Sequence, residues 1–139
     1  MAMTAAERGH CVFGTMNTSG VVNTIDRIID SFPIDEQQQV RTMIAGTLTG
    51  IAGLQLLPRA DGWGLMPAVE ILLGTQAICA TIREGKTNQI QSIMQTARAA
   101  GMQLMDDDIH RLLKEGKITP DTAHERSVDK RIFEPYLKA

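Results

Sequence analysis

Between residues 11 and 32, a short uncharged run gives way to apolar residues at helical spacing. Residues 11–15 favour strands, and the absence of charge predicts a strand buried on both faces, as in a parallel sheet. Thr18, Ser19 and Gly20 can cap a following helix, which Pro33 should end. The apolar positions of that helix are Val21, Val22, Ile25, Ile28, Ile29 and Phe32. Together they predict half of a βαβ unit, with residues 16–20 at the strand end where open α/β sheets bind ligands.

The next patterns predict a helix and a hairpin. A helix is expected over residues 37–49, with Asp35 as its cap and one apolar face. Strands are expected over 51–57 and 65–73, because Asp61-Gly62 between them is a strong turn signal. Pro67 favours an edge or an end for the second strand. Trp63 in the turn either anchors an interface or packs on its own hairpin.

From residue 75 onward, helical segments are punctuated by glycine. Helices are expected over 76–84, 88–99 and 106–115, followed by Gly85, Gly101 and Gly116. Thr119-Pro120 predicts the cap and first position of a fourth helix. Residues 131–137 are expected to form a docked tail. The five methionines from position 43 onward are expected to fill the core.

Composition narrows the class of protein. The chain has 139 residues, which is enough for one domain with a modest core. Its net charge is −2, and such a balance of charges argues against a basic surface that binds nucleic acid. It contains no run of about 20 apolar residues, so direct membrane insertion is not expected. Cys11 and Cys79 stand apart, which predicts two buried thiols in a cytosolic protein.

Several motifs resemble, in order, those of the secretion-type hexameric ATPases, and most closely the pilus-retraction ATPases of twitching motility. The family's His box is similar to Ala6-Glu7-Arg8-Gly9-His10, then Gly14-Thr15-Met16-Asn17-Thr18, then Asp26-Arg27-Ile28-Ile29-Asp30-Ser31-Phe32-Pro33. The family's hairpin motif is similar to residues 50–59, with Asp61, Gly62, Gly64, Ala68, Glu70, Ile71 and Leu72.

The resemblance implies an α/β fold: the C-terminal half of a RecA-like P-loop ATPase domain, with a partial sheet and a β-hairpin, then a C-terminal helical bundle. Residues 1–74 would belong to the ATPase core and 75–139 to the helical subdomain. Residues 1–8 read as the last turns of a helix, so the chain is expected to be the C-terminal part of a longer protein.

The chemistry of ATP requires parts that this sequence lacks. It has no G-x-x-x-x-G-K-[ST] loop and no apolar strand ending in Asp or Glu ahead of His10, the Walker A and Walker B elements. The full-length parent would use ATP and Mg²⁺. The chain alone is expected to bind no cofactor and to be inactive.

The remaining candidates are accessory. His10 matches the first His of the box, near the γ-phosphate, although a lone His beside a strand often has a structural role. Asn17 takes the second His position, and it can hydrogen-bond a phosphate but cannot carry positive charge. Arg8 stands where the family has Thr. Arg27 and Arg59 are candidates for nucleotide or inter-subunit contacts, with a solvated surface arginine as the alternative.

A second motif lies in the predicted helix over 76–84. Its residues Ala77, Ile78, Ile82, Arg83, Glu84 and Lys86 match the family's retraction motif. Cys79 and Thr81 replace the motif's first Arg and its Leu. The resemblance makes this helix a candidate for coupling ATP turnover to the pilus machine, whereas its pattern alone would suit any surface helix.

The resemblance implies that the parent is a homo-hexameric motor that hydrolyses ATP to retract type IV pili. It would be cytoplasmic, peripheral at the inner membrane, and docked on an inner-membrane platform protein. Two alternatives remain: a non-catalytic truncated paralogue that acts as an interaction module, and a related ATPase for secretion or DNA uptake.

Overall fold

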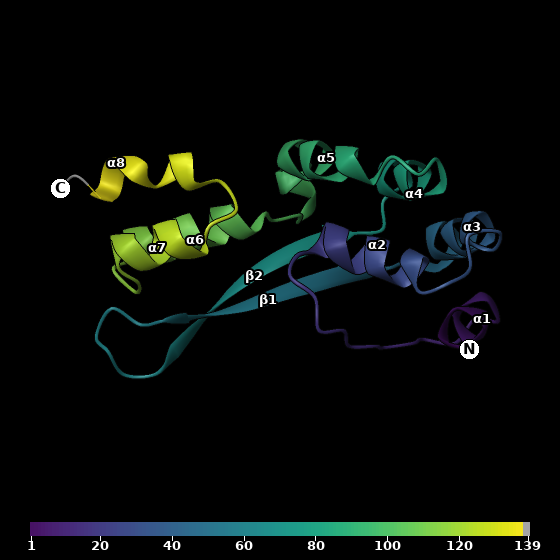
Figure 1. Ribbon diagram of the computed structural model, residues 1–139, viewed down its shortest axis with the longest axis horizontal. Helices are drawn as coiled ribbons and strands as arrows, with labels where there is room; N and C mark the ends of the chain where they lie inside the picture. Colours follow the sequence, from purple (N-terminus) through teal and green to yellow (C-terminus); the bar gives the residue numbers. More distant parts are fainter. Residues whose placement is uncertain (138–139) are drawn as a thin grey trace.

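A computed structural model describes residues 1–137, and one long antiparallel hairpin organises it (Figure 1). Strands β1 (Gly50–Pro58) and β2 (Leu65–Leu73) pair in a register running from Gly50 opposite Leu73 to Pro58 opposite Leu65. The predicted hairpin is therefore confirmed. Gly62 takes a φ of 77° in the turn, which suits a residue without a Cβ.

Helices α2 to α8 cover one side of this hairpin along its length, whereas α1 lies apart from them beside α3 (Figure 1). Their bounds are α1 (Ala2–Glu7), α2 (Val21–Asp30), α3 (Gln37–Thr47), α4 (Gln76–Arg83), α5 (Ile90–Thr96), α6 (Met105–Lys114), α7 (Pro120–Arg126) and α8 (Glu134–Leu137). Short 3-10 turns cover Thr87–Gln89, Arg98–Ala100 and Lys130–Ile132.

The predicted caps explain where two of these helices start. The Thr75 hydroxyl accepts a hydrogen bond from the Ile78 N–H at α4, and the Thr119 hydroxyl accepts one from the Thr122 N–H at α7. These bonds satisfy donors that have no partner within the first turn. At α3 the cap is Glu36, with no side-chain bond, rather than the expected Asp35.

The first of two hydrophobic cores lies where α2, α3, α4 and α5 meet the hairpin. Its fully buried members are Val21, Ile25, Leu72, Ile78, Ile82, Ile90 and Met94. Close approach at its edge is possible because residue 74 is glycine: a Cβ there would lie 1.9 Å from the Leu48 carbonyl oxygen.

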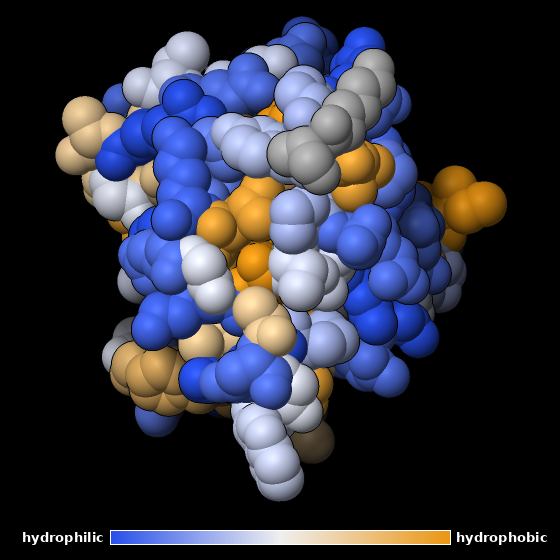
Figure 2. All heavy atoms as spheres, turned by 90° about the vertical axis from the view of Figure 1, so that its left-hand side faces the viewer, coloured by the Kyte–Doolittle hydropathy of each residue, from blue (hydrophilic) through white to orange (hydrophobic). Residues whose placement is uncertain are grey.

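The second core lies under α6, α7 and the tail. It includes Leu57, Ala68, Ile109, Ala123 and Phe133, and Phe133 is fully buried. The expected docked tail is therefore confirmed. At this end of the molecule, hydrophobic residues lie between hydrophilic ones (Figure 2). Each core draws on residues from both sides of position 74, and the division at that position stays a prediction.

The strand expected over residues 11–15 is wrong for this structure. The segment is extended and exposed, with Phe13 94% exposed, and it runs apart from the hairpin between α1 and α2 (Figure 1). A strand forms only where a neighbour pairs with its backbone. Within the described residues, no backbone group of residues 11–19 makes a backbone–backbone hydrogen bond.

The expected burial of both cysteines is likewise wrong, because Cys11 lies exposed in this segment and Cys79 is half-buried. The expectation for the methionines is confirmed: Met94, Met102 and Met105 are buried and Met43 and Met66 partly so. Across residues 1–137, none of the helices combines the length and the apolar character needed to cross a membrane.

Candidate functional site

The loop over residues 17–20 leads into α2 and is held by short-range hydrogen bonds. Thr24 donates from its hydroxyl to the Gly20 carbonyl oxygen (2.8 Å), and the Asn23 amide donates to the Ser19 carbonyl oxygen (2.6 Å). Gly20 has φ 88° and offers no side-chain cap. The cap comes instead from a distant residue: the Val21 N–H donates to the Glu70 carboxylate at 2.9 Å.

A cavity of about 760 Å³ with both polar and apolar walls lies beside this loop. Its polar lining includes Asn17, Arg27, Gln55, Glu70, Asn88 and Arg126. Arginines from α2 and α7, several amides and one buried carboxylate thus line the same cavity. The cavity therefore offers hydrogen-bond donors and positive charge, the features that recognise anionic groups.

Glu70 is the buried charge of this region, with 4% of its surface exposed. Burial raises the pKa of its carboxyl above the ordinary value, and nearby Asp106 raises it further. Hydrogen bonds from the backbone of Val21 and Met105 act in the opposite direction and favour the ionised form.

Asn17 and Arg27 come together at this cavity, because Arg27 donates to the Asn17 carbonyl oxygen at 3.0 Å. His10 and Arg8 lie elsewhere, beside α1, where they line a hollow of about 320 Å³. The His10 Nδ1 atom lies 3.1 Å from the Ala5 carbonyl oxygen. The structure therefore brings two of the five accessory candidates to the cavity.

Arg59 is at the hairpin turn and is not part of the cavity lining. It pairs with Asp61 at 2.6 Å, and that hydrogen bond lowers the pKa of Asp61 to about 2. The Asp61 carboxylate also accepts from the Trp63 N–H at 3.0 Å. The Trp63 side chain is 82% exposed and does not pack on the hairpin.

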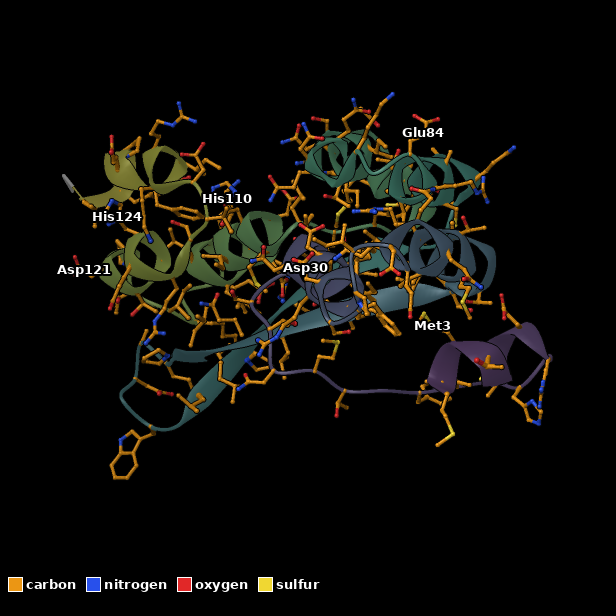
Figure 3. All side chains as sticks on the ribbon, turned by 45° about the vertical axis from the view of Figure 1, so that its right-hand side comes forward. Met3, Asp30, Glu84, His110, Asp121 and His124 are labelled. Atoms are coloured by element: carbon orange, nitrogen blue, oxygen red, sulfur yellow. The ribbon has the colours of Figure 1, made fainter. Side chains whose placement is uncertain are left out.

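The six residues of the coupling motif divide between the core and the surface. Ile78 and Ile82 on α4 are fully buried. Ala77, Arg83, Glu84 and Lys86 are exposed, and Glu84 points outward at the end of α4 (Figure 3). Lys86 pairs with Glu84 at 2.9 Å, and the Arg83 carbonyl oxygen accepts from Gln38 of α3. The apolar pair thus fixes the helix while its charged end faces outward.

Sequence reasoning assigned no role to Glu70, Asn88 or Arg126. For Glu70 a signal exists: one carboxylate interrupts the apolar run Ala68-Val69-Glu70-Ile71-Leu72 at an inward position of β2. No group of three or more His, Cys, Asp or Glu side chains within residues 1–137 could hold a metal ion.

Comparisons with known proteins agree with this fold. The chain is 44% identical over 127 residues to a twitching motility protein of Neisseria gonorrhoeae, covering 91% of this chain and 34% of that protein. It is 40% identical over 127 residues to the type IV pilus retraction ATPase PilT of Pseudomonas aeruginosa, covering 91% of this chain and 37% of PilT. The chain thus spans about a third of the length of these relatives. No protein-family model matches it.

Solved structures give the same result. A crystal structure of the pilus retraction motor PilT with bound ADP superposes with a TM-score of 0.83 at 41% identity, over 96% of this chain and 37% of that one. The ATPase DotB of Legionella pneumophila superposes with a TM-score of 0.72 at 26% identity, over 87% and 32%. In sequence and in fold, this chain is similar to the C-terminal part of type IV pilus retraction ATPases.

Proposed function

We propose that this chain serves as the C-terminal part of a hexameric motor that hydrolyses ATP to retract type IV pili. The observation that carries the proposal is the similarity to two proteins of twitching motility and pilus retraction, at 44% and 40% identity over 91% of the chain. The placement of the retraction-like motif supports it, because Ile78 and Ile82 are buried and the charged end of the helix is exposed.

The residues present indicate which part of the nucleotide site this chain would supply. The sequence has no phosphate loop, which supplies most of the backbone donors and the lysine needed for phosphoryl transfer. ATP and Mg²⁺ would therefore be held mainly by parts outside these 139 residues. Asn17 and Arg27 line the cavity beside the loop over residues 17–20, and their side chains could donate hydrogen bonds to phosphate oxygens in an accessory role. His10 and Arg8 would contribute from the segment before α2.

The proposal also includes the location of the motor, its partner and its subunit arrangement. It would work in the cytoplasm at the inner membrane, where the exposed end of α4 would meet a platform protein. Six copies would form a ring, with Arg8, Arg27 and Arg59 as candidates for contacts to nucleotide or to neighbouring subunits.

A chimera tests the proposal. The matching C-terminal part of Pseudomonas aeruginosa PilT is replaced by this chain, and twitching and ATP hydrolysis are measured in a strain lacking its own PilT. We expect both activities to be restored. In the same chimera, Arg83→Ala should leave ATP hydrolysis largely intact and abolish twitching, because the end of α4 transmits motion and performs no chemistry.

Lys114→Ala is the matched control, since it removes an exposed cation from the last turn of α6 as Arg83→Ala does from α4. It should leave both activities unchanged. A parallel fall of hydrolysis and twitching in Arg83→Ala would contradict the coupling role. Hydrolysis without twitching in the unmodified chimera would favour a related ATPase for secretion or DNA uptake, and loss of both would favour a non-catalytic module.

A further inference from the structure

The Glu70 carboxylate on β2 binds the first residue of a helix that is far away in sequence. It accepts a hydrogen bond at 2.9 Å from the N–H of Val21, where α2 begins. Met105, where α6 begins, lines the same cavity as Glu70. The N-terminus of a helix carries partial positive charge, so the carboxylate stabilises the start of α2.

Two glycines lie beside this side chain. Gly53 is its direct partner across the hairpin, and a Cβ there would lie 3.4 Å from both the Cβ and the Oε2 of Glu70. A Cβ on Gly20 would lie 3.5 Å from the same oxygen. The Glu70 side chain is thus close to the backbone of β1 on one side and to the backbone before α2 on the other.

The start of α6 is joined firmly to β2 on either side of Glu70. The Val69 N–H donates to the Asp108 carboxylate at 2.8 Å, and Ile71 and Gln103 exchange backbone hydrogen bonds of 2.8 and 3.0 Å. The Gln103 amide also donates to the Val69 carbonyl oxygen. A displacement of α6 is therefore carried into the segment of β2 that holds Glu70.

The start of α2 is joined to the loop over residues 17–20, and Arg27 on the same helix donates to the Asn17 carbonyl oxygen. Glu70 contacts this unit through the hydrogen bond to the Val21 N–H. The N-cap residue of α2, Gly20, has no side chain that could accept this bond, so the position of the loop depends on the distant carboxylate.

We infer that Glu70 is a positioning residue that couples the start of α6 to the loop over residues 17–20 at the start of α2. A displacement of the C-terminal helices would be transmitted to Asn17 and Arg27 through this one side chain. A displacement of the loop would be transmitted to the C-terminal helices in the same way. Its use in a motor cycle rests on the proposed function, whereas the coupling is a property of this chain by itself.

The test uses amide hydrogen exchange and ¹⁵N chemical shifts of the 139-residue chain. Glu70→Gln keeps the shape and removes the charge. Exchange at Val21 should rise by about tenfold or more, as expected when a hydrogen bond to a charged acceptor is weakened. Asp61→Asn is the matched control, because the Asp61 carboxylate also accepts from a backbone N–H, that of Trp63 at 3.0 Å, and lies at the hairpin turn. It should raise exchange at Trp63 and leave Val21 unchanged.

A second measurement separates coupling from simple stabilisation. Ile109→Val, a small change at a fully buried position of α6, should shift the Val21 amide resonance in the otherwise unchanged chain and leave it unshifted in the Glu70→Gln background. If Glu70→Gln does not fold, Glu70→Asp replaces it, since the shorter side chain keeps the charge and moves the carboxylate away from the Val21 N–H. It should raise exchange at Val21.

An unchanged exchange rate at Val21 in Glu70→Gln, or an Ile109→Val effect that survives in Glu70→Gln, would overturn the inference. Neither outcome depends on nucleotide or on pili, so a failure here leaves the proposed function standing. A failed chimera would equally leave this coupling standing.

Discussion

Truncating Ile82 and Arg83, neighbours in the coupling motif, should lower stability by very different amounts. Ile82 is fully buried in the first core, whereas Arg83 is exposed in the last turn of α4. Ile82→Ala removes three carbons from a packed site. At about 0.8 kcal/mol for each buried CH₂, the lost transfer energy is about 2.4 kcal/mol. The residual cavity raises the expected loss to about 3–4 kcal/mol.

Arg83→Ala should cost at most about 1 kcal/mol, because the side chain is exposed and its favourable interaction with the helix dipole is weak. Urea unfolding followed by circular dichroism measures both variants. The slope with denaturant should stay unchanged, so the difference appears in the midpoint. For a chain of this size the Ile82→Ala loss corresponds to a fall in melting temperature of about 10 °C or more.

Ile82→Val serves as the graded control, with an expected loss of about 0.5–1.5 kcal/mol. The reasoning is refuted if Arg83→Ala destabilises the chain as much as Ile82→Ala does. In that case the charged end of α4 is a structural element, and its proposed role in meeting a partner loses its basis.

Three further predictions concern steric fit, pH and nucleotide. Gly74→Ala should lower the free energy of unfolding by about 2 kcal/mol or more, because the added Cβ would overlap the Leu48 carbonyl oxygen. Gly46→Ala in α3 should raise the free energy of unfolding by about 0.5–1 kcal/mol, because a Cβ there meets nothing within 4 Å. The midpoints of urea unfolding measure both changes. Because the folded pKa of Glu70 lies above its ordinary value of 4.5, its contribution to the free energy of unfolding is largest below 4.5 and falls as pH rises through the folded pKa. The free-energy difference between the unchanged chain and Glu70→Gln should therefore vary with pH in urea titrations from pH 7 down to 4.5, and a constant difference would contradict this. Millimolar Mg-ATP should raise the melting temperature of the 139-residue chain by no more than about 2 °C. A ligand with a millimolar dissociation constant, present at that concentration, stabilises the folded chain by only about 0.4 kcal/mol.

The local structure of this protein was determined by its sequence to a large degree. The turn at Asp61-Gly62, the caps at Thr75 and Thr119, and the 3.6-residue spacing in α2 each depend on residues a few positions apart. Their energetics are therefore complete within a short stretch of chain, and the hairpin and most helices begin and end near the expected residues.

The strand expected over residues 11–15 shows where local information ends. Its composition suits a strand, yet backbone hydrogen bonds in a sheet come from a neighbouring strand that the segment itself does not specify. The described residues provide no such neighbour, and the segment lies exposed. The same limit applies to Cys11, whose burial depended on that strand.

The cavity and its carboxylate were decided only by tertiary structure. Val21 and Glu70 are 49 positions apart along the chain. A charge in the apolar run of β2 marks Glu70 as unusual, but its cost of burial is offset only when the N-terminus of α2 lies beside it. Sequence pattern fixes which faces of the elements are apolar, whereas the partners of a buried polar group depend on how those elements pack together in three dimensions.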